Sequence, residues 1–487
     1  MCHGRRPGRP RHRGSGPSVT RGRLAVHAHF YQPSRIDPWT GEVPEEPAAA
    51  PFHDWNERVD AESYRPNAAR GNLERISWDL GPTLGSWLAD SDPATLGGFV
   101  AAARGNAMAQ AFHHSILPLA SAADRRTEIR WGLREFEFRF GQRPLGLWLP
   151  ETAVDLTTLR IAAEEGIRYT ILAPWQAADP AIDTRRPYRV DVGGDRSIVA
   201  VFFDAGLSAA VSFEPEATSD ADRFARDRVA ARLGGGGDDG QPPLAVIAMD
   251  GELYGHHQQF RDLFLQRLVA PDSGSADRGF DVVSLAAAIA EPPDRPHPLV
   301  RIADRTSWSC HHGVLRWCAE CPDAVDGRWK GALRAAFERL AGGIDLATES
   351  AVAALPGSPE PWPLRDAWVD VVIGATTPEA LMAAQVPSLT ARTDRDRLAT
   401  LLEAQRWRLA MFASDGWYWD DPIRHETRQV MRSAARAARL VDGEMGTSLE
   451  GRLVADLELF ASPSRGLDGA DIYRMALADI DQPAPRN

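Results

Sequence analysis

Titratable side chains follow several short apolar segments of this 487-residue sequence. The clearest case is LAVIAMDGELYGH (244–256), in which six apolar residues lead directly into two carboxylates and a histidine. The groups at such positions are Asp250, Glu252 and His256 in this segment, His27 and His29 in RLAVHAHF, Glu151 after GLWLP, and Asp204 after SIVAVFF. A buried carboxylate costs free energy unless it is paired or takes part in chemistry. Several such groups on separate segments therefore indicate one shared site.

Two of these acids, Glu151 and Asp250, suit a reaction that needs a pair of carboxylates. Glycoside cleavage uses one carboxylic acid to protonate the leaving oxygen and a second carboxylate to attack the sugar carbon or to activate water. Each residue also has an ordinary structural explanation. Asp250 could cap a helix, Glu151 could open one, and the histidines could be satisfied in the core. The arrival of several segments at one edge favours the catalytic interpretation.

Tryptophan is abundant, with 15 residues against 7 tyrosines. An indole ring presents a flat apolar face to the C–H groups of a sugar, and its N–H can bond a hydroxyl. Six tryptophans lie in or beside the segments with titratable groups: Trp148, Trp175, Trp308, Trp317, Trp417 and Trp419. We expect about half of them to line a sugar-binding cleft and the rest to pack in the core.

Strand-like and helix-like segments alternate from about residue 23 onward. The strand-like segments are RLAVHAHF, LGLWLP, YTILAP, SIVAVFF, LAVIAM and FDVVSL. Short apolar segments of this kind are typical of strands buried on both faces, and their alternation with helices predicts a parallel α/β barrel or open sheet. In such a barrel the reactive groups collect where the strands end, which accounts for the positions of the titratable residues.

The pattern changes after about residue 300, where helical periodicity replaces the strand signals. Examples are LRAAFERLAGG, DRDRLATLLEAQRWRLAMFA and RHETRQVMRSAARAARL. We therefore predict a barrel domain at 24–298 and a mostly helical domain at 299–487, with the boundary near EPPDRPHP (291–298). The helical domain is expected to contribute to the active-site cleft.

The formal net charge is −12, although residues 1–23 contain seven arginines and no acid. An acidic body argues against a nucleic-acid backbone as the main partner. No stretch approaches the ~20 apolar residues of a membrane span, and the basic leader lacks the apolar region of a secretory signal. We expect a soluble, cytoplasmic protein with a disordered leader at 1–23.

The four cysteines, Cys2, Cys310, Cys318 and Cys321, are too few for a disulfide scaffold. Three of them form a Cys-x7-Cys-x2-Cys pattern beside His311 and His312. This pattern could hold zinc or an iron–sulfur cluster, but its spacing fits no standard ligand set. We favour the alternative in which Cys310 and His311 project from a loop into the glycan cleft. The prediction is therefore no metal and no cofactor.

Three segments together resemble glycoside hydrolase family 57: HAHFYQP (27–33), GLWLPE (146–151) and MDGELYGH (249–256). The resemblance extends over about residues 24–430. It implies an incomplete (β/α)7 barrel followed by a helical region. It also implies action on α-glucans as an amylase, a 4-α-glucanotransferase or a branching enzyme, without a metal.

The resemblance assigns roles to individual residues. Glu151 matches the nucleophile of a retaining mechanism, and Asp250 matches its acid/base, whose pKa burial and Glu151 should raise. The residues predicted to contact substrate are His27, His29, Trp148, Trp175, Glu252, His256, Trp308, Cys310, His311, Asp415 and Trp417. The segment ASDGWYWDD (413–421) is similar to a Ser-Asp-Trp motif of the family, with Gly416 inserted.

Other positions depart from the family. Met108 of GNAM (105–108) stands where a Glu is common, and His113 and His114 are expected to fill part of that role. The segment SWSCHHGVLRW (307–317) resembles a divergent subgroup in which a helical domain of unknown function follows the barrel.

A glycosidase implies a polysaccharide or oligosaccharide substrate. Two rival functions also stay open at this point. A metal-dependent barrel enzyme, deacetylase-like or mannosidase-like, could bind zinc through a ligand set made of His27, His29, Asp204, Asp250 and His256. A non-catalytic glycan-binding protein is the second rival, because Met108 departs from the family pattern.

Overall fold

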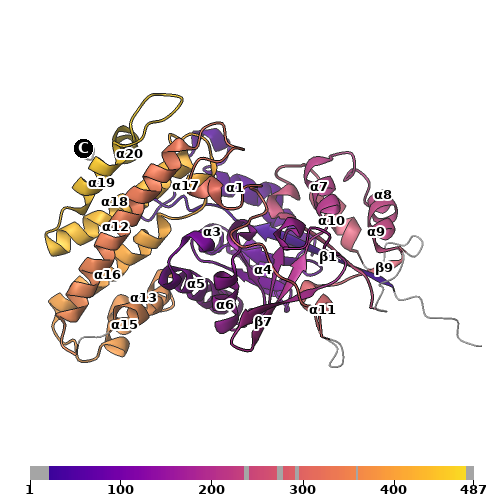
Figure 1. Cartoon of the computed structure of the whole chain (residues 1–487), viewed down its shortest axis with the longest axis horizontal. Helices are drawn as coiled ribbons and strands as arrows, with labels where there is room; N and C mark the ends of the chain where they lie inside the picture. The colour runs from indigo at the N-terminus through magenta and orange to yellow at the C-terminus, as the bar shows by residue number, and fades with distance from the viewer. Residues whose placement is uncertain (1–20, 235–240, 271–277, 291–295, 358–359, 479–487) are drawn as a thin grey trace, which may run out of the picture.

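The computed structural model describes residues 21–234, 241–270, 278–290, 296–357 and 360–478 (Figure 1). The leader predicted to be disordered lies almost wholly outside these residues, as does most of the predicted domain boundary. Within the described residues, no helix is both long enough and apolar enough to cross a membrane.

The strands form two sheets. The first has the order β4-β3-β2-β1-β8, with β9 also beside β1, and the second has the order β5-β7-β6. The strands of the first sheet are β1 (Gly22–Phe30), β2 (Ser77–Leu80), β3 (Ala107–Gln110), β4 (Leu147–Trp148), β8 (Leu244–Asp250) and β9 (Phe280–Val282). Those of the second are β5 (Tyr169–Leu172), β6 (Tyr188–Gly193) and β7 (Arg196–Phe202).

Contacts between their edge strands join the two sheets into a ring. A parallel bridge between Gly146 and Tyr169 links β4 to β5, and the Asp204 N–H donates to the Val246 carbonyl across 2.7 Å, linking the end of β7 to β8. Strands β1, β2, β3, β4, β5, β7 and β8 therefore form a ring of seven parallel strands, with β6 antiparallel at its outside. This arrangement confirms the predicted α/β barrel.

Alternating side chains divide the barrel strands into an inner and an outer set. The outer set packs against helices and includes Leu24, Val26, Trp78, Leu147, Ala200 and Ile247. The inner set includes Ala25, Met108, Trp148, Tyr169, Ile171, Val201, Val246 and Ala248. Continuing the inner alternation toward the strand ends reaches His27, His29 and Asp250. The barrel interior thus changes from apolar to polar at its C-terminal end.

The helices of the barrel region are α1 (Trp55–Val59), α2 (Arg65–Ala69), α3 (Pro82–Ser91), α4 (Pro93–Ala102), α5 (Ala122–Phe140), α6 (Leu156–Glu164), α7 (Ala205–Phe213), α8 (Ala221–Phe224), α9 (Ala231–Leu233), α10 (Arg261–Val269) and α11 (Leu285–Ala288). Asp155 is the N-cap of α6, because its carboxylate accepts from the Thr158 N–H at 2.7 Å. Glu151 therefore does not open this helix and lies in the preceding turn, η4 (Pro150–Thr152).

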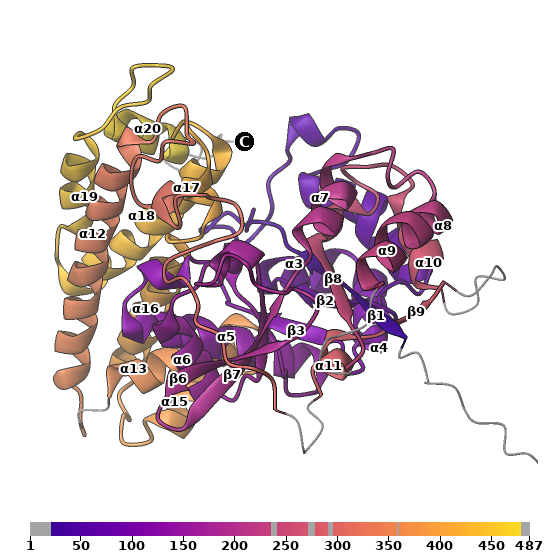
Figure 2. The same cartoon turned by 45° about the vertical axis from the view of Figure 1, so that its right-hand side comes forward.

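The C-terminal region is helical, as predicted. Its helices are α12 (Arg328–Ala353), α13 (Pro361–Ala367), α14 (Val369–Val372), α15 (Pro378–Gln385), α16 (Arg392–Ala410), α17 (Asp415–Tyr418), α18 (His425–Met445), α19 (Leu449–Leu457) and α20 (Gly469–Leu477). Figures 1 and 2 show the long helices α12, α16 and α18 packed beside one another at one side of the barrel. Their shared core contains Leu333, Phe337, Ile344, Leu401, Ala434 and Val441.

The connecting segment 299–327 runs along the barrel before the helices begin. Isolated bridges join Ile302 to Ala177 and Thr306 to Val154. These contacts hold the segment against the loops that follow β4 and β5, which brings residues 307–310 to the C-terminal end of the ring.

Candidate active site

Glu151 occupies a strained turn at the end of β4. Its backbone is left-handed (φ 57°, ψ 22°), and Thr152 beside it has φ 48°. Such conformations cost free energy in residues other than glycine and concentrate at functional sites. Gln176 holds the turn in place, since its amide donates to the Thr152 carbonyl at 2.8 Å and accepts from the Thr152 hydroxyl at 2.9 Å.

The carboxylate of Glu151 receives two hydrogen bonds from the connecting segment. The Ser309 hydroxyl donates to Oε2 at 2.5 Å and the Trp308 indole N–H donates to the same oxygen at 3.0 Å. Burial raises the pKa of Glu151, the Ser309 hydrogen bond opposes that rise, and the charge of Asp250 adds to it. The two donors therefore favour the ionised form that a nucleophile needs.

Asp250 ends β8 and stays open to solvent. Among the described residues, none makes a hydrogen bond to its carboxylate, and it does not cap the short turn η7 (Gly251–Leu253) that follows. Solvent reaches the Asp250 carboxylate, but the dense protein around it limits its hydration. This loss of hydration raises the pKa of Asp250, and the positive charge of His29 moderates the rise. The expected direction is thus found with loss of hydration as the main cause, and the negative charge that adds to it is that of Asp79 instead of Glu151. An accessible carboxylic acid with a raised pKa suits a general acid.

A row of three groups crosses the adjoining strands, and two of them, Asp79 and His29, are buried. The strand register aligns Asp79 of β2 with His29 of β1, and His29 with Asp250 of β8. Asp79 bridges both histidines, with Oδ1 3.0 Å from His27 Nε2 and Oδ2 2.8 Å from His29 Nδ1. Burial disfavours charge on His29, but the Asp79 carboxylate outweighs it and raises the pKa of His29 to about 9. His29 is therefore a cation beside both catalytic candidates at neutral pH.

Glu252 lies deeper than Asp250 and is buried. Its Oε1 accepts from the Tyr64 hydroxyl and from the Tyr31 N–H at 3.3 Å. Burial and the charge of Asp250 raise its pKa to about 7. These hydrogen bonds tie the turn that follows Asp250 to Tyr31 and Tyr64.

The helical region completes the site with Ser414 and Asp415. The Tyr31 hydroxyl donates to Asp415 Oδ2 at 2.5 Å, and the Ser414 hydroxyl lies 2.6 Å from His114 Nδ1. The rings of Tyr31 and His114 stack with their centroids 3.9 Å apart. Burial raises the pKa of Asp415 to about 6. The structure thus brings Asp415 onto Tyr31, 384 positions away in sequence, and within electrostatic reach of Glu151.

Tryptophans at the site differ in exposure. Trp175 is 43% exposed and its indole donates to the Ser307 carbonyl at 2.9 Å, so its ring can meet a ligand. Trp308 is partly buried and borders Glu151. Trp148 and Trp417 are 0% and 1% exposed, which corrects the expectation that they contact substrate. Trp148 instead stacks on both His27 and His29, with centroids 4.8 and 4.9 Å apart, and fixes their rings.

Three further expectations are corrected by the geometry. Cys310 does not project toward the site, because its thiol is buried and lies 3.6 Å from Cys321 Sγ. His256 is bonded to Glu62 and not to the catalytic candidates. His113 is bonded to Glu128 at 2.8 Å, so only its neighbour His114 reaches the site. His311 is exposed, with its ring 6.5 Å from that of Trp175.

The zinc ligand set of the rival metal enzyme is not assembled. Asp204 caps α7 by accepting from the Leu207 N–H at 2.9 Å and pairs with Arg232. His256 is occupied by Glu62. Among the described residues, the one group of three or more side chains placed to hold a metal ion lies elsewhere, in 310–323.

Sequence reasoning missed several residues of the site: Tyr31, Tyr64, Asp79, Ser309 and Ser414. Asp79 belongs to the four-residue strand SWDL, which is too short to show a pattern. Ser309 and Ser414 carried a usable signal, because each lies next to a residue that was selected.

Two regions of the chain match the models of known protein families. Residues 99–276 match the model of glycosyl hydrolase family 57, and residues 326–481 match a domain of unknown function (DUF3536). The two matched regions are separate and follow one another along the chain. No curated protein matches the sequence.

Solved structures with the same fold include three enzymes. A maltose-forming amylase from Pyrococcus sp. ST04 has a TM-score of 0.71 at 15% identity, over 93% of this chain and 88% of that one. A branching enzyme from Thermococcus kodakaraensis has a TM-score of 0.59 at 14% identity, over 94% of both chains. A 4-α-glucanotransferase from Thermococcus litoralis has a TM-score of 0.56 at 15% identity, over 86% of this chain and 60% of that one. At these identities the likeness establishes the fold.

Proposed function

We propose that this protein is a retaining glycoside hydrolase or transglycosylase that acts on α-glucans. The observation that carries the proposal is the pairing of two unlike carboxylates at one end of the barrel. Glu151 is held by two hydrogen-bond donors, whereas Asp250 is open to solvent and has none among the described residues. The fold shared with a maltose-forming amylase and a branching enzyme supports the choice of α-glucans.

The first half of the proposed reaction forms a covalent intermediate. An ionised Glu151 oxygen attacks the anomeric carbon while the bond from that carbon to the leaving oxygen breaks. Asp250 gives its proton to the departing oxygen and becomes a carboxylate. The cationic His29 then faces the new charge on Asp250 and stabilises it.

The second half releases the sugar. The Asp250 carboxylate removes a proton from water or from a sugar hydroxyl, whose oxygen attacks the anomeric carbon and displaces Glu151. Water gives hydrolysis, and a sugar hydroxyl gives transfer. The net configuration at the anomeric carbon is retained because each half inverts it.

The proposal is tested by conservative substitutions assayed on maltoheptaose, amylose and glycogen. Glu151→Gln should lower kcat by about 10³-fold or more, and Asp250→Asn by about 10²- to 10⁴-fold. Glu74→Gln is the matched control, because Glu74 is exposed and takes no part in the contacts described for the site. Folded wild-type protein without activity on any α-glucan would exclude the proposal, as would a Glu151→Gln variant with wild-type rates.

A further inference from the structure

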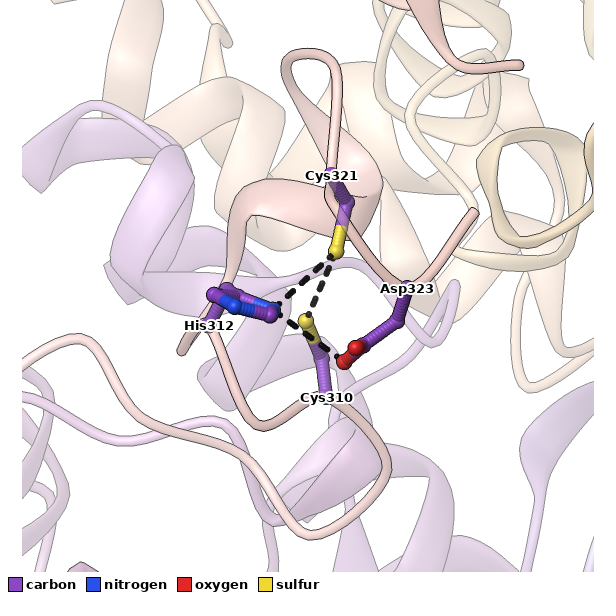
Figure 3. Close-up of side chains that lie close together, drawn as sticks. All are labelled: Cys310, His312, Cys321 and Asp323. Atoms are coloured by element: carbon purple, nitrogen blue, oxygen red, sulfur yellow. Dashed lines mark hydrogen bonds and ion pairs between the residues drawn. The ribbon is translucent and has the colours of Figure 1, made fainter. Parts of the chain in front are cut away.

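Four potential metal ligands converge in the connecting segment, outside the catalytic pair. They are Cys310, His312, Cys321 and Asp323, and their ligand atoms all lie within 4.8 Å of one another. Figure 3 shows the four side chains pointing toward a common centre from two turns of the segment. The measured separations are 3.6 Å between the two sulfurs, 3.7 Å from Cys321 Sγ to His312 Nδ1, and 3.1 Å from that nitrogen to Asp323 Oδ2.

These three of the six ligand separations are close to the edges of a tetrahedron around zinc, and all six are within 4.8 Å. Zinc binds sulfur at about 2.3 Å and nitrogen or oxygen at about 2.0–2.1 Å. Tetrahedral angles then place two sulfurs about 3.8 Å apart, sulfur and nitrogen about 3.6 Å apart, and nitrogen and oxygen about 3.3 Å apart. The separation of the two sulfurs is also well beyond the ~2.05 Å of a disulfide bond.

The backbone builds the two turns specifically. Gly313 closes the first turn by donating to the Cys310 carbonyl at 3.1 Å, and its φ of 77° favours glycine. A Cβ at Gly313 would lie 2.3 Å from the Arg305 carbonyl oxygen. In the second turn the Ala324 N–H donates to the Cys321 carbonyl at 2.9 Å. Each turn thereby presents a cysteine and, two residues later, a histidine or an aspartate.

We propose that Cys310, His312, Cys321 and Asp323 bind one zinc ion. Four protein ligands fill a tetrahedral zinc site and leave no position for substrate, which is the arrangement of a structural site. The set contains two thiolates, whereas iron–sulfur clusters are held by four cysteines or by cysteines with histidines. The two cysteines are buried and the two other ligands are exposed, so the ion sits at the surface end of a sulfur-lined recess.

The ion also has a structural consequence for the catalytic pair. Cys310 directly follows Ser309 and Trp308, which donate to Glu151. A metal that fixes Cys310 against the second turn restrains both donors. An effect of the metal on catalysis would rest on the proposed function. The restraint of the segment does not, because it can be measured without an activity assay.

Metal content of the purified full chain is the direct test. We expect about one zinc per chain in the wild type, as for a closed four-ligand site. His312→Ala should lose it, whereas His311→Ala, which removes the neighbouring exposed histidine, should keep it. Cys321→Ser and Cys318→Ser form a second matched pair, because the Cys318 thiol bonds the Val314 carbonyl and lies outside the cluster. His311 and His312 are both exposed, so we expect the His311→Ala and His312→Ala proteins to fold.

Several outcomes would overturn the proposal. They are a wild type that neither contains nor takes up zinc, equal zinc in the His311 and His312 variants, and loss of two titratable thiols to a disulfide in the native protein. Zinc removed by dilute competing ligand without change in the segment would indicate an adventitious ion only. The proposal requires the opposite: chelation should increase backbone hydrogen exchange in 305–325 in the wild type, and the metal-free His312→Ala protein should already show the faster exchange.

Discussion

At the scale of residues, the ionisation of Glu151 depends on two hydrogen bonds from the connecting segment. Ser309→Ala removes the donor at 2.5 Å and leaves Trp308 in place. Because the Ser309 hydrogen bond holds the pKa of Glu151 down, its loss should raise that pKa further. We expect the acidic limb of the kcat/KM profile to move to higher pH and the rate at the optimum to fall about tenfold, as for one charge-assisted bond.

The measurement is a pH profile of kcat/KM for the two proteins. Ser350→Ala is a suitable control, because Ser350 is exposed on α12 and its hydroxyl bonds the Leu346 carbonyl of the same helix. An acidic limb that does not move in Ser309→Ala would show that the bond has no influence on the nucleophile.

The buried pair of His29 and Asp79 makes stability depend on pH. The pKa of His29 rises from 6.5 to about 9 on folding, so its stabilisation is complete below pH 6.5 and is lost as the pH rises through 9. The shift corresponds to about 3 kcal/mol in the free energy of unfolding. Urea unfolding of wild type on both sides of this window should show the loss, and His29→Gln should show a flatter dependence. Equal slopes in the two proteins would contradict this assignment.

At the scale of elements, the space around a glycine shows whether its helix packs closely against a neighbour at that position or is exposed there. In α5, a Cβ at Gly132 would lie 1.8 Å from the Gln110 carbonyl oxygen at the end of β3. In α12, a Cβ at Gly342 would meet nothing within 4 Å. Gly132→Ala should therefore destabilise the protein by about 2 kcal/mol or more, and Gly342→Ala should stabilise it by about 1 kcal/mol. Thermal unfolding of both variants tests the pair, and similar shifts would contradict the packing of α5 on β3.

Long apolar strands and amphipathic helices were predictable from sequence because their patterns are local. LAVIAM and SIVAVFF became β8 and β7, and the helical periodicity after residue 300 became α12, α16 and α18. Strands β2 and β3 are four residues each and carry no readable pattern, so Asp79 was missed.

The direction in which a side chain points was harder to predict from the sequence than the element to which it belongs. Trp148 and Trp417 were selected for their neighbours in sequence, yet both face inward. Cys310 was expected to project into the glycan cleft, whereas its thiol is buried and lies 3.6 Å from Cys321 Sγ. Contacts across turns decide these outcomes, and spacing alone does not reveal them.

At the scale of the whole molecule, the helical region covers apolar surface of the barrel. Trp131 of α5 donates its indole N–H to the Arg365 carbonyl at 3.1 Å, and the buried Arg365 guanidinium donates to Asp124 at 2.9 Å. Arg408 pairs with the same carboxylate at 2.7 Å. Two hydrophobic clusters also cross the boundary, through Phe112 and Ile116. The two regions therefore share two hydrophobic clusters and a buried ion-pair network.

We expect the full chain to unfold in one calorimetric transition, because separation of the regions would expose these apolar side chains and leave buried charges unpaired. A fragment of residues 21–298 should be insoluble or should bind a hydrophobic dye. Two well-separated transitions, or a folded and monodisperse fragment, would contradict this view.

The central claim is that Glu151 attacks the sugar and Asp250 handles the proton. Its most direct test is the Asp250→Asn variant incubated with an α-maltosyl fluoride, whose fluoride departs without protonation and whose covalent intermediate lacks a base to resolve it. Peptide mass spectrometry should find a maltosyl adduct on Glu151, and the double variant with Glu151→Gln should show none. An adduct on another residue, or turnover without any adduct, would contradict the account.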